Sequence, residues 1–199
     1  MAKEIERKFF IHSPRDVQIL WERLAFSTQK ALINQGYLNT DGPTTRVRIE
    51  DQHATLTIKG ERNKKTGAKL EFEYDIPLKD ASKLMMMCRP RVITKTRHIL
   101  PLEKLLQLEA FPRSAFKVIE GGPSVQLEVD VFHGLFLGLL YVEVERPEGL
   151  TDDRWKNLPL PEWISNNEVT GMKGFSNRHL AESGKFPKVP DQFVNFSRK

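Results

Sequence analysis

The sequence lacks the residues on which several kinds of protein depend. It contains one cysteine, Cys88, which excludes an intramolecular disulfide and a cysteine-rich zinc site. None of its five histidines belongs to an HExxH motif or to another paired ligand spacing. The longest apolar run, around residues 135–142, is far shorter than a membrane span. The first residues are charged from Lys3 onward, unlike a signal peptide. We therefore expect a soluble, cytoplasmic protein without a membrane partner.

Charged residues, by contrast, are abundant and nearly balanced. The 199 residues include 31 Lys and Arg and 26 Asp and Glu, which gives a formal net charge of +5. A basic excess favours an anionic partner such as phosphate, nucleic acid or a membrane surface. Because the excess is small, the positions of the charges must decide among these partners. The basic loop from Gly60 to Gly67 lacks the Gly-Lys-Ser/Thr ending of a phosphate-binding P-loop.

Short strand-like segments dominate the chain, each bounded by Gly, Asp or Asn turns. We expect strands at residues 4–11, 31–39, 44–50, 54–59, 70–76, 92–100, 125–132 and 136–145. Helices are expected after the caps Ser13, Asp80, Thr151 and Ser176, and at residues 102–108. This pattern predicts an α+β fold: a closed, eight-stranded antiparallel barrel with a polar interior and with helices packed outside it.

One domain is expected over residues 1–184, followed by a loosely attached tail at residues 185–199. The segment at residues 102–122 interrupts the succession of strands and has the character of an insertion.

Charged residues spaced by two recur on strand after strand. Because successive side chains of a strand point to opposite faces, each set lines one face of the sheet. The sets are Glu4, Glu6 and Lys8; Arg46 and Arg48; Glu71, Glu73 and Asp75; Lys95 and Arg97; Glu128 and Asp130; and Glu143 and Glu145. Lys59 ends a strand whose Thr55 and Thr57 lie on the same side as its own side chain.

For any single strand, the simplest interpretation is a solvated outer face. Two features favour an interior face for the set as a whole. Most of the strands carry charges of one sign, whereas an ordinary soluble surface mixes signs. The apolar faces could be covered from outside by helical residues such as Trp21, Leu24, Leu84 and Met87. A polar interior of this kind requires a charged ligand.

The residue types indicate which ligand this would be. Arg and Lys side chains that converge from several strands suit a polyanion with many oxygens. Carboxylates beside them would repel that anion unless a hard divalent cation lay between, and Mg²⁺ and Mn²⁺ prefer oxygen ligands shared with phosphates. These sets of charged residues spaced by two, which we call the charge ladders, therefore predict a polyphosphate bound together with Mg²⁺ or Mn²⁺.

The opening strand, Glu4-Ile5-Glu6-Arg7-Lys8-Phe9, resembles the E-x-E-x-K strand of the triphosphate tunnel metalloenzymes, also called CYTH proteins. The resemblance continues through the other ladders in the same order and covers nearly the whole chain. Near the carboxyl end, Glu168-Val169-Thr170-Gly171 followed by Asn177 is similar to the bacterial members.

This resemblance implies a tunnel that hydrolyses a triphosphate, inorganic tripolyphosphate first among the candidates, with Mg²⁺ or Mn²⁺. The implied metal ligands are Glu4, Glu6, Glu143 and Glu145. The implied phosphate contacts are Lys8, Arg46, Arg48, Lys59, Lys95, Arg97 and Lys173, the last closing the mouth unless it is a solvated loop lysine. An acidic wall of Glu71, Glu73, Glu128 and Asp130 would include the group that orients water. Glu4, Glu6, Lys8, Arg48, Lys59 and Arg97 form the implied catalytic set.

Other functions stay open at this point. Class IV adenylate cyclases and thiamine triphosphatases share the implied tunnel, although no adenine pocket can be identified here. A non-catalytic barrel that binds polyphosphate or nucleic acid would also fit the composition. Barrels that bind single strands usually expose aromatic platforms among basic residues, whereas Phe72 and Tyr74 fall on the side opposite the acids. Nucleic acid is therefore disfavoured. The sequence does not fix the oligomeric state and allows a homodimer, and the segment at residues 102–122 could cover a tunnel mouth.

Overall fold

The computed structural model describes residues 5–39, 41–62, 69–88 and 90–194. Its eight strands form one antiparallel sheet in the order β1-β8-β7-β6-β2-β3-β4-β5. The strands are β1 (Glu6–Ile11), β2 (Gln29–Tyr37), β3 (Thr44–Glu50), β4 (His53–Arg62), β5 (Lys69–Asp75), β6 (Ile93–Pro101), β7 (Gln126–Phe132) and β8 (Leu140–Glu145). The predicted number and antiparallel arrangement of strands are confirmed.

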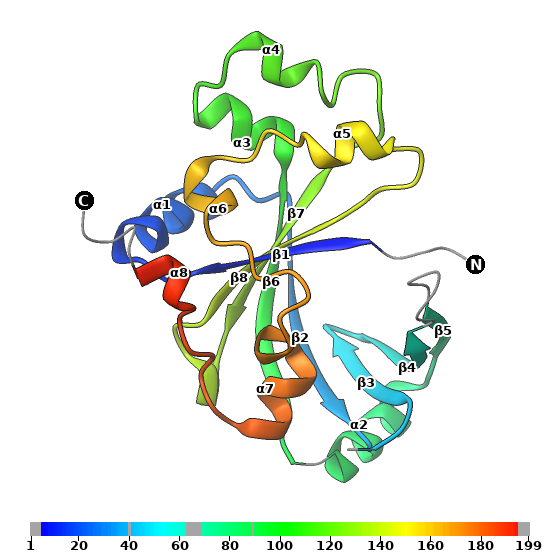
Figure 1. The fold of residues 1–199 in the computed structure, drawn as a ribbon. Helices are drawn as coiled ribbons and strands as arrows, with labels where there is room; N and C mark the ends of the chain where they lie inside the picture. The colour runs from blue at the N-terminus through cyan, green and yellow to red at the C-terminus, as the bar shows by residue number, and fades with distance from the viewer. Residues whose placement is uncertain (1–4, 40, 63–68, 89, 195–199) are drawn as a thin grey trace.

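The helices lie between and around these strands (Figure 1). They are α1 (Pro14–Leu24), α2 (Leu78–Met87), α3 (Leu102–Leu108), α4 (Arg113–Phe116), α5 (Asp152–Lys156), α6 (Glu162–Ser165), α7 (Asn177–Ser183) and α8 (Asp191–Val194), with 3₁₀ turns η1 (Gly134–Phe136) and η2 (Lys173–Phe175). Ser13, Thr151 and Ser176 cap helices as predicted, each accepting a backbone N–H at its side-chain oxygen. No helix in the described ranges is long and apolar enough to cross a membrane.

Most predicted strand ends differ from the observed ones by up to three residues. Two further boundaries are wrong for an identifiable physical reason. Asp80 does not cap α2, because the helix begins two residues earlier at Leu78 and Asp80 lies in its first turn. A carboxylate there still complements the helix dipole. Strand β8 begins at Leu140 rather than at Phe136, because residues 134–136 form the turn η1, where Gly134 adopts a positive φ of 57°.

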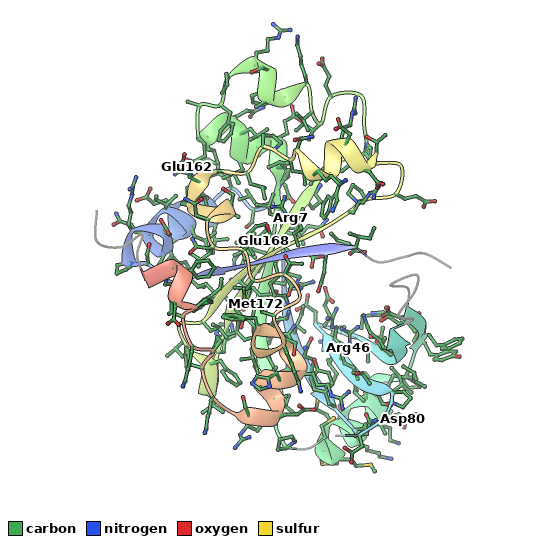
Figure 2. The ribbon with its side chains drawn as sticks, viewed as in Figure 1. Arg7, Arg46, Asp80, Glu162, Glu168 and Met172 are labelled. Atoms are coloured by element: carbon green, nitrogen blue, oxygen red, sulfur yellow. The ribbon has the colours of Figure 1, made fainter. Side chains whose placement is uncertain are left out.

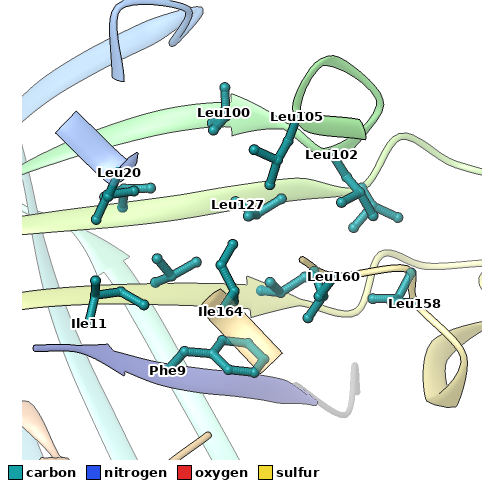
Figure 3. Packing of buried hydrophobic residues seen from close by; sticks show 14 of the residues in the cluster. Phe9, Ile11, Leu20, Leu100, Leu102, Leu105, Leu127, Leu158, Leu160 and Ile164 are labelled. Carbon is teal, nitrogen blue, oxygen red and sulfur yellow. The ribbon is translucent and has the colours of Figure 1, made fainter. Parts of the chain in front are cut away.

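The face of the sheet opposite the charge ladders packs against helices. Figure 3 shows Phe9 and Ile11 of β1 and Leu127 of β7 beside Leu20 of α1 and Leu105 of α3, all of them buried. Leu24 also packs in this core, as predicted, whereas the Trp21 side chain is half exposed.

Helix α2 covers β3 and β4 in a smaller core. Ala81 and Cys88 are buried there against Val47, and Leu84 packs beside them, while Met87 stays exposed. Helical covering of the apolar face is therefore confirmed, although Trp21 and Met87 contribute less than expected.

The segment at residues 102–122 belongs to the main core. Leu102, Leu105 and Leu106 of α3 are completely buried, and α3, α4 and α5 gather at one end of the sheet (Figure 1). Its helix α3 therefore covers the apolar face.

The predicted closure of the barrel is absent from the described residues, where β1 and β5 remain the two edges of the sheet. A segment that we call the strap, residues 167–170, occupies the second edge of β1. Phe10 N donates to Asn167 O at 2.9 Å, and Val169 N donates to Lys8 O at 2.8 Å. The Arg7 guanidinium also pairs with Glu168 at 2.7 Å, and Figure 2 shows the two residues together. Because these backbone groups are already bonded, this part of β1 cannot also pair with β5.

The carboxyl-terminal region is anchored as well. Residues 191–194, predicted as part of a loose tail, form α8. Its Phe193 is buried and stacks on the His12 ring at a centroid distance of 5.7 Å.

Candidate functional site

The strand register places the charge ladders on one face of the sheet, which we call the charged face. Cα partners across the strands include Glu6 with Glu145, Lys8 with Glu143, Glu128 with Glu143, Arg97 with Asp130, Arg46 with Thr57, Thr57 with Glu73, and Lys59 with Glu71. Glu4, the first residue of the predicted motif, lies outside the described residues.

Arg97 is the centre of an ion network on this face. Its guanidinium donates to Asp130 through Nε and Nη2, both at 2.8 Å, and to Glu143 Oε2 through Nη2 at 2.7 Å. Its Nη1 also contacts Glu128. Lys8 Nζ pairs with Glu143 Oε1 at 2.8 Å, and Lys95 Nζ contacts Asp130. Four strands thus contribute to one buried network of cations and carboxylates.

These contacts lower the pKa values of the carboxylates Glu143 and Asp130. Burial by itself would raise the pKa of Glu143, but Lys8, Lys95 and Arg97 outweigh it and hold that pKa far below its ordinary value. Burial would likewise raise the pKa of Asp130, which Lys95 and Arg97 lower. The two carboxylates therefore remain ionised and bound to their cations at neutral pH.

Lys95 differs from the other cations because its side chain is completely buried. Burial lowers its pKa to about 8, although Asp130 acts in the opposite direction. Its ammonium lies 5.8 Å from the Phe132 ring centroid, and that of Lys8 lies 5.5 Å from the Tyr141 centroid. Both rings belong to an apolar cluster that closes one end of the charged face.

The arginines of β3 are less neutralised than Arg97. Arg46 Nη2 donates to Thr57 Oγ1 at 3.0 Å and lies 3.4 Å from the half-exposed Glu73 carboxylate. Arg48 has no carboxylate partner in the part of the chain that the structure describes, and its Nη2 donates to Gln35 Oε1 at 3.2 Å. The Nε atoms of both arginines are buried without a hydrogen-bond partner. A buried unsatisfied donor is costly, so these two groups are suited to an incoming anion.

Several polar residues of this face were not predicted. Gln35 and Tyr37 are buried beside the β3 arginines, as is Thr57, whose side had been predicted, and Tyr141 is buried between Phe10 and Phe132. Their charges are zero, so they do not stand out in a ladder of Arg, Lys, Asp and Glu. Strand alternation in the segment predicted at residues 31–39 was the available signal for Gln35 and Tyr37.

The sheet curves around its charged face. A cleft of about 920 Å³ is lined both by Glu71 and Glu73 of β5 and by Glu145 of β8, although these strands lie near opposite ends of the strand order. A second cleft of about 560 Å³ is lined by Arg48, Arg97 and Glu128 together with Glu50, other residues of β2 and β6, and the turn residue Asp51. The charged face is therefore accessible to ligands, and its first cleft is acidic.

Some of the acidic residues on the charged face are placed where they could bind a divalent cation. The described residues contain no group of three or more His, Cys, Asp or Glu side chains arranged for a metal ion. Mg²⁺, however, is usually held by one or two carboxylates together with substrate phosphates and water. Glu6 and Glu145 are directly opposite each other on β1 and β8, and like charges so placed gain from a bridging cation. Glu143, also predicted as a metal ligand, is paired in this structure with Lys8 through one carboxylate oxygen and with Arg97 through the other.

Lys173 is not brought into the ion network. It lies in η2, where its side chain is exposed and takes part in no ion pair within the described ranges.

Comparisons with known proteins agree with this arrangement. A family model described as the CYTH domain matches residues 2–153. A solved structure of the inorganic triphosphatase NE1496 shares 26% sequence identity over 94% of this chain and 99% of that chain, with a TM-score of 0.56. A structure of a putative adenylyl cyclase, HpAC1 from Hippeastrum, described as having a dominant triphosphatase activity, is 17% identical over 79% of this chain and 84% of that chain. Its TM-score of 0.51 shows a likeness of fold. No curated protein matches the chain.

Proposed function

Because the chain belongs to the CYTH domain family, we propose that it hydrolyses a triphosphate, inorganic tripolyphosphate in the first place, with the help of a divalent cation. The observation that carries the proposal is the set of cations from four strands on one accessible face: Lys8, Arg46, Arg48, Lys59, Lys95 and Arg97. The likeness to the inorganic triphosphatase NE1496, over nearly the full length of both chains, supports the choice of tripolyphosphate.

Arg46 and Arg48 are the first contacts that we propose for the phosphate chain. Their buried Nε donors lack partners, and Arg48 forms no ion pair among the described residues, since Glu50 and Asp130 act on its charge only at longer range. Lys8, Lys95 and Arg97 supply further positive charge from the neighbouring strands. Charge that develops on the transferred phosphoryl group would be stabilised by such fixed cations.

Glu6 and Glu145 are the residues that we propose to hold Mg²⁺ or Mn²⁺, and Glu4 would join them if the resemblance of the opening motif holds. A bound cation would polarise phosphate oxygens and offset the repulsion between the carboxylates and the substrate.

The attacking water would be oriented by the acidic wall. Asp130 is fully occupied by Lys95 and Arg97. Glu71, Glu73 and Glu128, which line the 920 Å³ cleft, are therefore the candidates that we propose for this role.

The test is phosphate release from tripolyphosphate, ATP and thiamine triphosphate, with Mg²⁺ or Mn²⁺ and with a chelator. Tripolyphosphate should be hydrolysed fastest, and chelation should abolish turnover until the metal is restored. Phosphate release that is equal with and without metal, or absent with every substrate, would overturn the proposal.

Arg48→Met gives a sharper test, because it removes a cation without leaving a buried carboxylate unpaired. We expect kcat/KM for tripolyphosphate to fall about 100-fold or more, with the circular dichroism spectrum unchanged and Tm lowered only by the loss of the donor to Gln35 Oε1. Arg15→Met, at an exposed position of α1 outside the charged face, is the matched control and should keep full activity.

A further inference from the structure

Gln35 is a buried neutral residue on the charged face. It lies on β2 directly opposite Arg48 of β3 and Ile93 of β6, and its side chain has no solvent exposure. Burial alone does not demand an amide here, since Ile33, two residues earlier on the same face of β2, is equally buried and apolar. A primary amide is costly to bury unless its polar atoms are bonded. The hydrogen bonds of its two polar atoms must therefore offset the cost of burying this amide.

Both ends of the amide are engaged. Arg48 Nη2 donates to Gln35 Oε1 at 3.2 Å, and Gln35 Nε2 donates to Tyr37 Oη at 3.1 Å. A guanidinium can only donate, so the amide oxygen must face Arg48 and the amide nitrogen must face Tyr37. The Tyr37 oxygen accordingly accepts, and its own proton is left for another acceptor.

The Tyr37 proton has no acceptor among the residues that the structure describes. Burial raises the pKa of the phenol, while Arg46, Arg48 and Lys8 act in the opposite direction, and the net effect is upward. The hydroxyl therefore stays protonated at neutral pH, surrounded by three cations of the charged face. A ligand oxygen that binds these cations would find a donor already present.

Arg97 shows how carboxylate partners, unlike the neutral amide of Gln35, affect the charge of a guanidinium on this face. Its guanidinium is held by Asp130, Glu143 and Glu128, whose negative charges offset its own. The amide of Gln35 orients Arg48 through one hydrogen bond at 3.2 Å and carries no charge to cancel. A neutral acceptor therefore fixes the direction of this guanidinium and leaves its attraction for an anion intact.

We propose that Gln35 is a positioning residue of the substrate site: it turns Arg48 and the Tyr37 hydroxyl toward a bound triphosphate while leaving the Arg48 charge unneutralised. The inference rests on the proposed function, since it concerns the anion that the same face would bind.

Two substitutions separate charge from shape. Gln35→Glu keeps an oxygen that accepts from Arg48 but introduces a carboxylate, which neutralises Arg48 and also draws the Tyr37 proton. Gln35→Met keeps the volume and removes both hydrogen bonds. The control is Asn34→Asp, an amide-to-acid change at the next residue of β2, whose side chain faces the opposite side and accepts from Thr94 Oγ1 at 2.8 Å.

The measurements are the Kd of tripolyphosphate by calorimetry without metal, and kcat and KM with Mg²⁺. Loss of one charge-assisted contact should weaken tripolyphosphate binding about 10- to 100-fold in Gln35→Glu, mainly as a higher KM. The deficit relative to the unsubstituted protein should shrink as pH falls and the new carboxylate protonates. The deficit of Gln35→Met should not depend on pH, and Asn34→Asp should bind as the unsubstituted protein does.

The possible failures can be told apart. If the unsubstituted protein neither binds nor hydrolyses tripolyphosphate, the proposed function fails first. If it does both, and Gln35→Glu stays within about twofold of its Kd and KM, the positioning role is wrong. Equal, pH-independent losses in both Gln35 variants that follow the folded fraction would likewise overturn the role, because they would show a merely structural amide.

Discussion

At the scale of single residues, the burial of Lys95 determines the pH range in which its side chain is positively charged. Its ammonium is enclosed by protein and contacts Asp130, and burial lowers its pKa to about 8. As pH rises through that value, the folded protein loses this positive charge from the charged face.

We therefore expect the affinity for tripolyphosphate to decrease as pH rises through about 8. Lys95→Met should bind less tightly at neutral pH but should lack this decrease, because the titrating group is gone. Calorimetric Kd values for both proteins from about pH 7 to about pH 9 give the comparison, and ionisation of tripolyphosphate itself cancels in their ratio. A ratio that does not change with pH would show that Lys95 does not titrate in this range.

Glu143 is the carboxylate whose loss should affect stability most clearly. It holds Lys8 and Arg97, and these cations keep its pKa far below the ordinary value of 4.5. Because the folded-state pKa is lowered, its contribution to stability is present above about pH 4.5 and is lost as pH falls.

Glu143→Gln should lower the free energy of unfolding by about 3–5 kcal/mol at neutral pH, because it leaves buried cations undercompensated. Its stability should also fall less on acidification than that of the unsubstituted protein. Urea titrations at neutral and acidic pH measure both effects. Glu22→Gln, at a mainly exposed pair with Arg23, should change stability by no more than about 0.5 kcal/mol. A similar small change at Glu143 would contradict the importance of its ion pairs.

The residues of the charged face differ in how well their roles can be predicted from the sequence. Lys8 and Arg97 stand in sets of charged residues spaced by two, so strand alternation alone indicates which face each occupies. The ion pair between Glu143 and Lys8 could not be predicted, because it depends on the register between β1 and β8. Gln35 and Tyr37 carry no charge and acquire their importance from Arg48 on the adjacent strand.

At the scale of elements, the contact between β2 and α2 depends on one glycine. A Cβ atom added at Gly36 would lie 2.6 Å from both Cβ and Sγ of Cys88 and 3.2 Å from Met85 Sδ. The helix can approach the strand this closely because Gly36 has no side chain.

Gly36→Ala should therefore lower the free energy of unfolding by about 1–3 kcal/mol through overpacking. Adding Cys88→Ala should not restore stability, because the clash includes Cβ, whereas adding Cys88→Gly should relieve the clash in part. Urea unfolding of the single and double variants tests this order. Gly174→Ala serves as the control, since nothing lies within 4 Å of its added Cβ. If Gly36→Ala left the free energy of unfolding unchanged, α2 would have to be able to shift on the sheet without cost.

Elements that were predicted well have strong local signals. Helix α7 begins after Ser176 and ends before Gly184, which adopts a left-handed φ of 62°. Helices α4, α6 and α8 have four residues each, too few to establish a period of 3.6, so no comparable local signal predicts them. The apolar residues Phe136 and Leu139 extend the strand pattern before Leu140, although Phe136 lies in η1 and Leu139 precedes β8.

At the scale of the whole molecule, ligand binding should couple separate parts of the sheet. The cations of the charged face come from β1, β3, β4 and β6, and they converge only in the folded chain. Tripolyphosphate should therefore bind the folded state and not the unfolded one.

Linkage gives a stabilisation of about 2.7 kcal/mol at a tripolyphosphate concentration of about 100 times Kd. Thermal unfolding with tripolyphosphate, and with sulfate at the same ionic strength, would measure the specific part of this effect. Arg48→Met at the same tripolyphosphate concentration should be stabilised much less. Equal stabilisation of both proteins would place the anion at a site that does not include Arg48.

The open form of the sheet could not be derived from the strand pattern. Eight alternating strands are compatible with a closed barrel, and the family resemblance also implies one. The edge of β1 is instead bonded to the strap, about 160 positions away in the sequence, and no local feature of β1 announces that partner. Only the three-dimensional structure shows that these hydrogen bonds are already made.

Two open edges expose a sheet protein to aggregation through strand pairing between molecules. The strap covers one of them on β1, while the second edge of β5 pairs with no strand in the described part of the chain. On β5, Glu71, Glu73 and Asp75 alternate with the exposed rings of Phe72 and Tyr74. Two such edges brought together would oppose carboxylate to carboxylate, and this repulsion disfavours pairing even though the rings are exposed. The strand that we expect to face the substrate thus also helps to keep separate molecules apart.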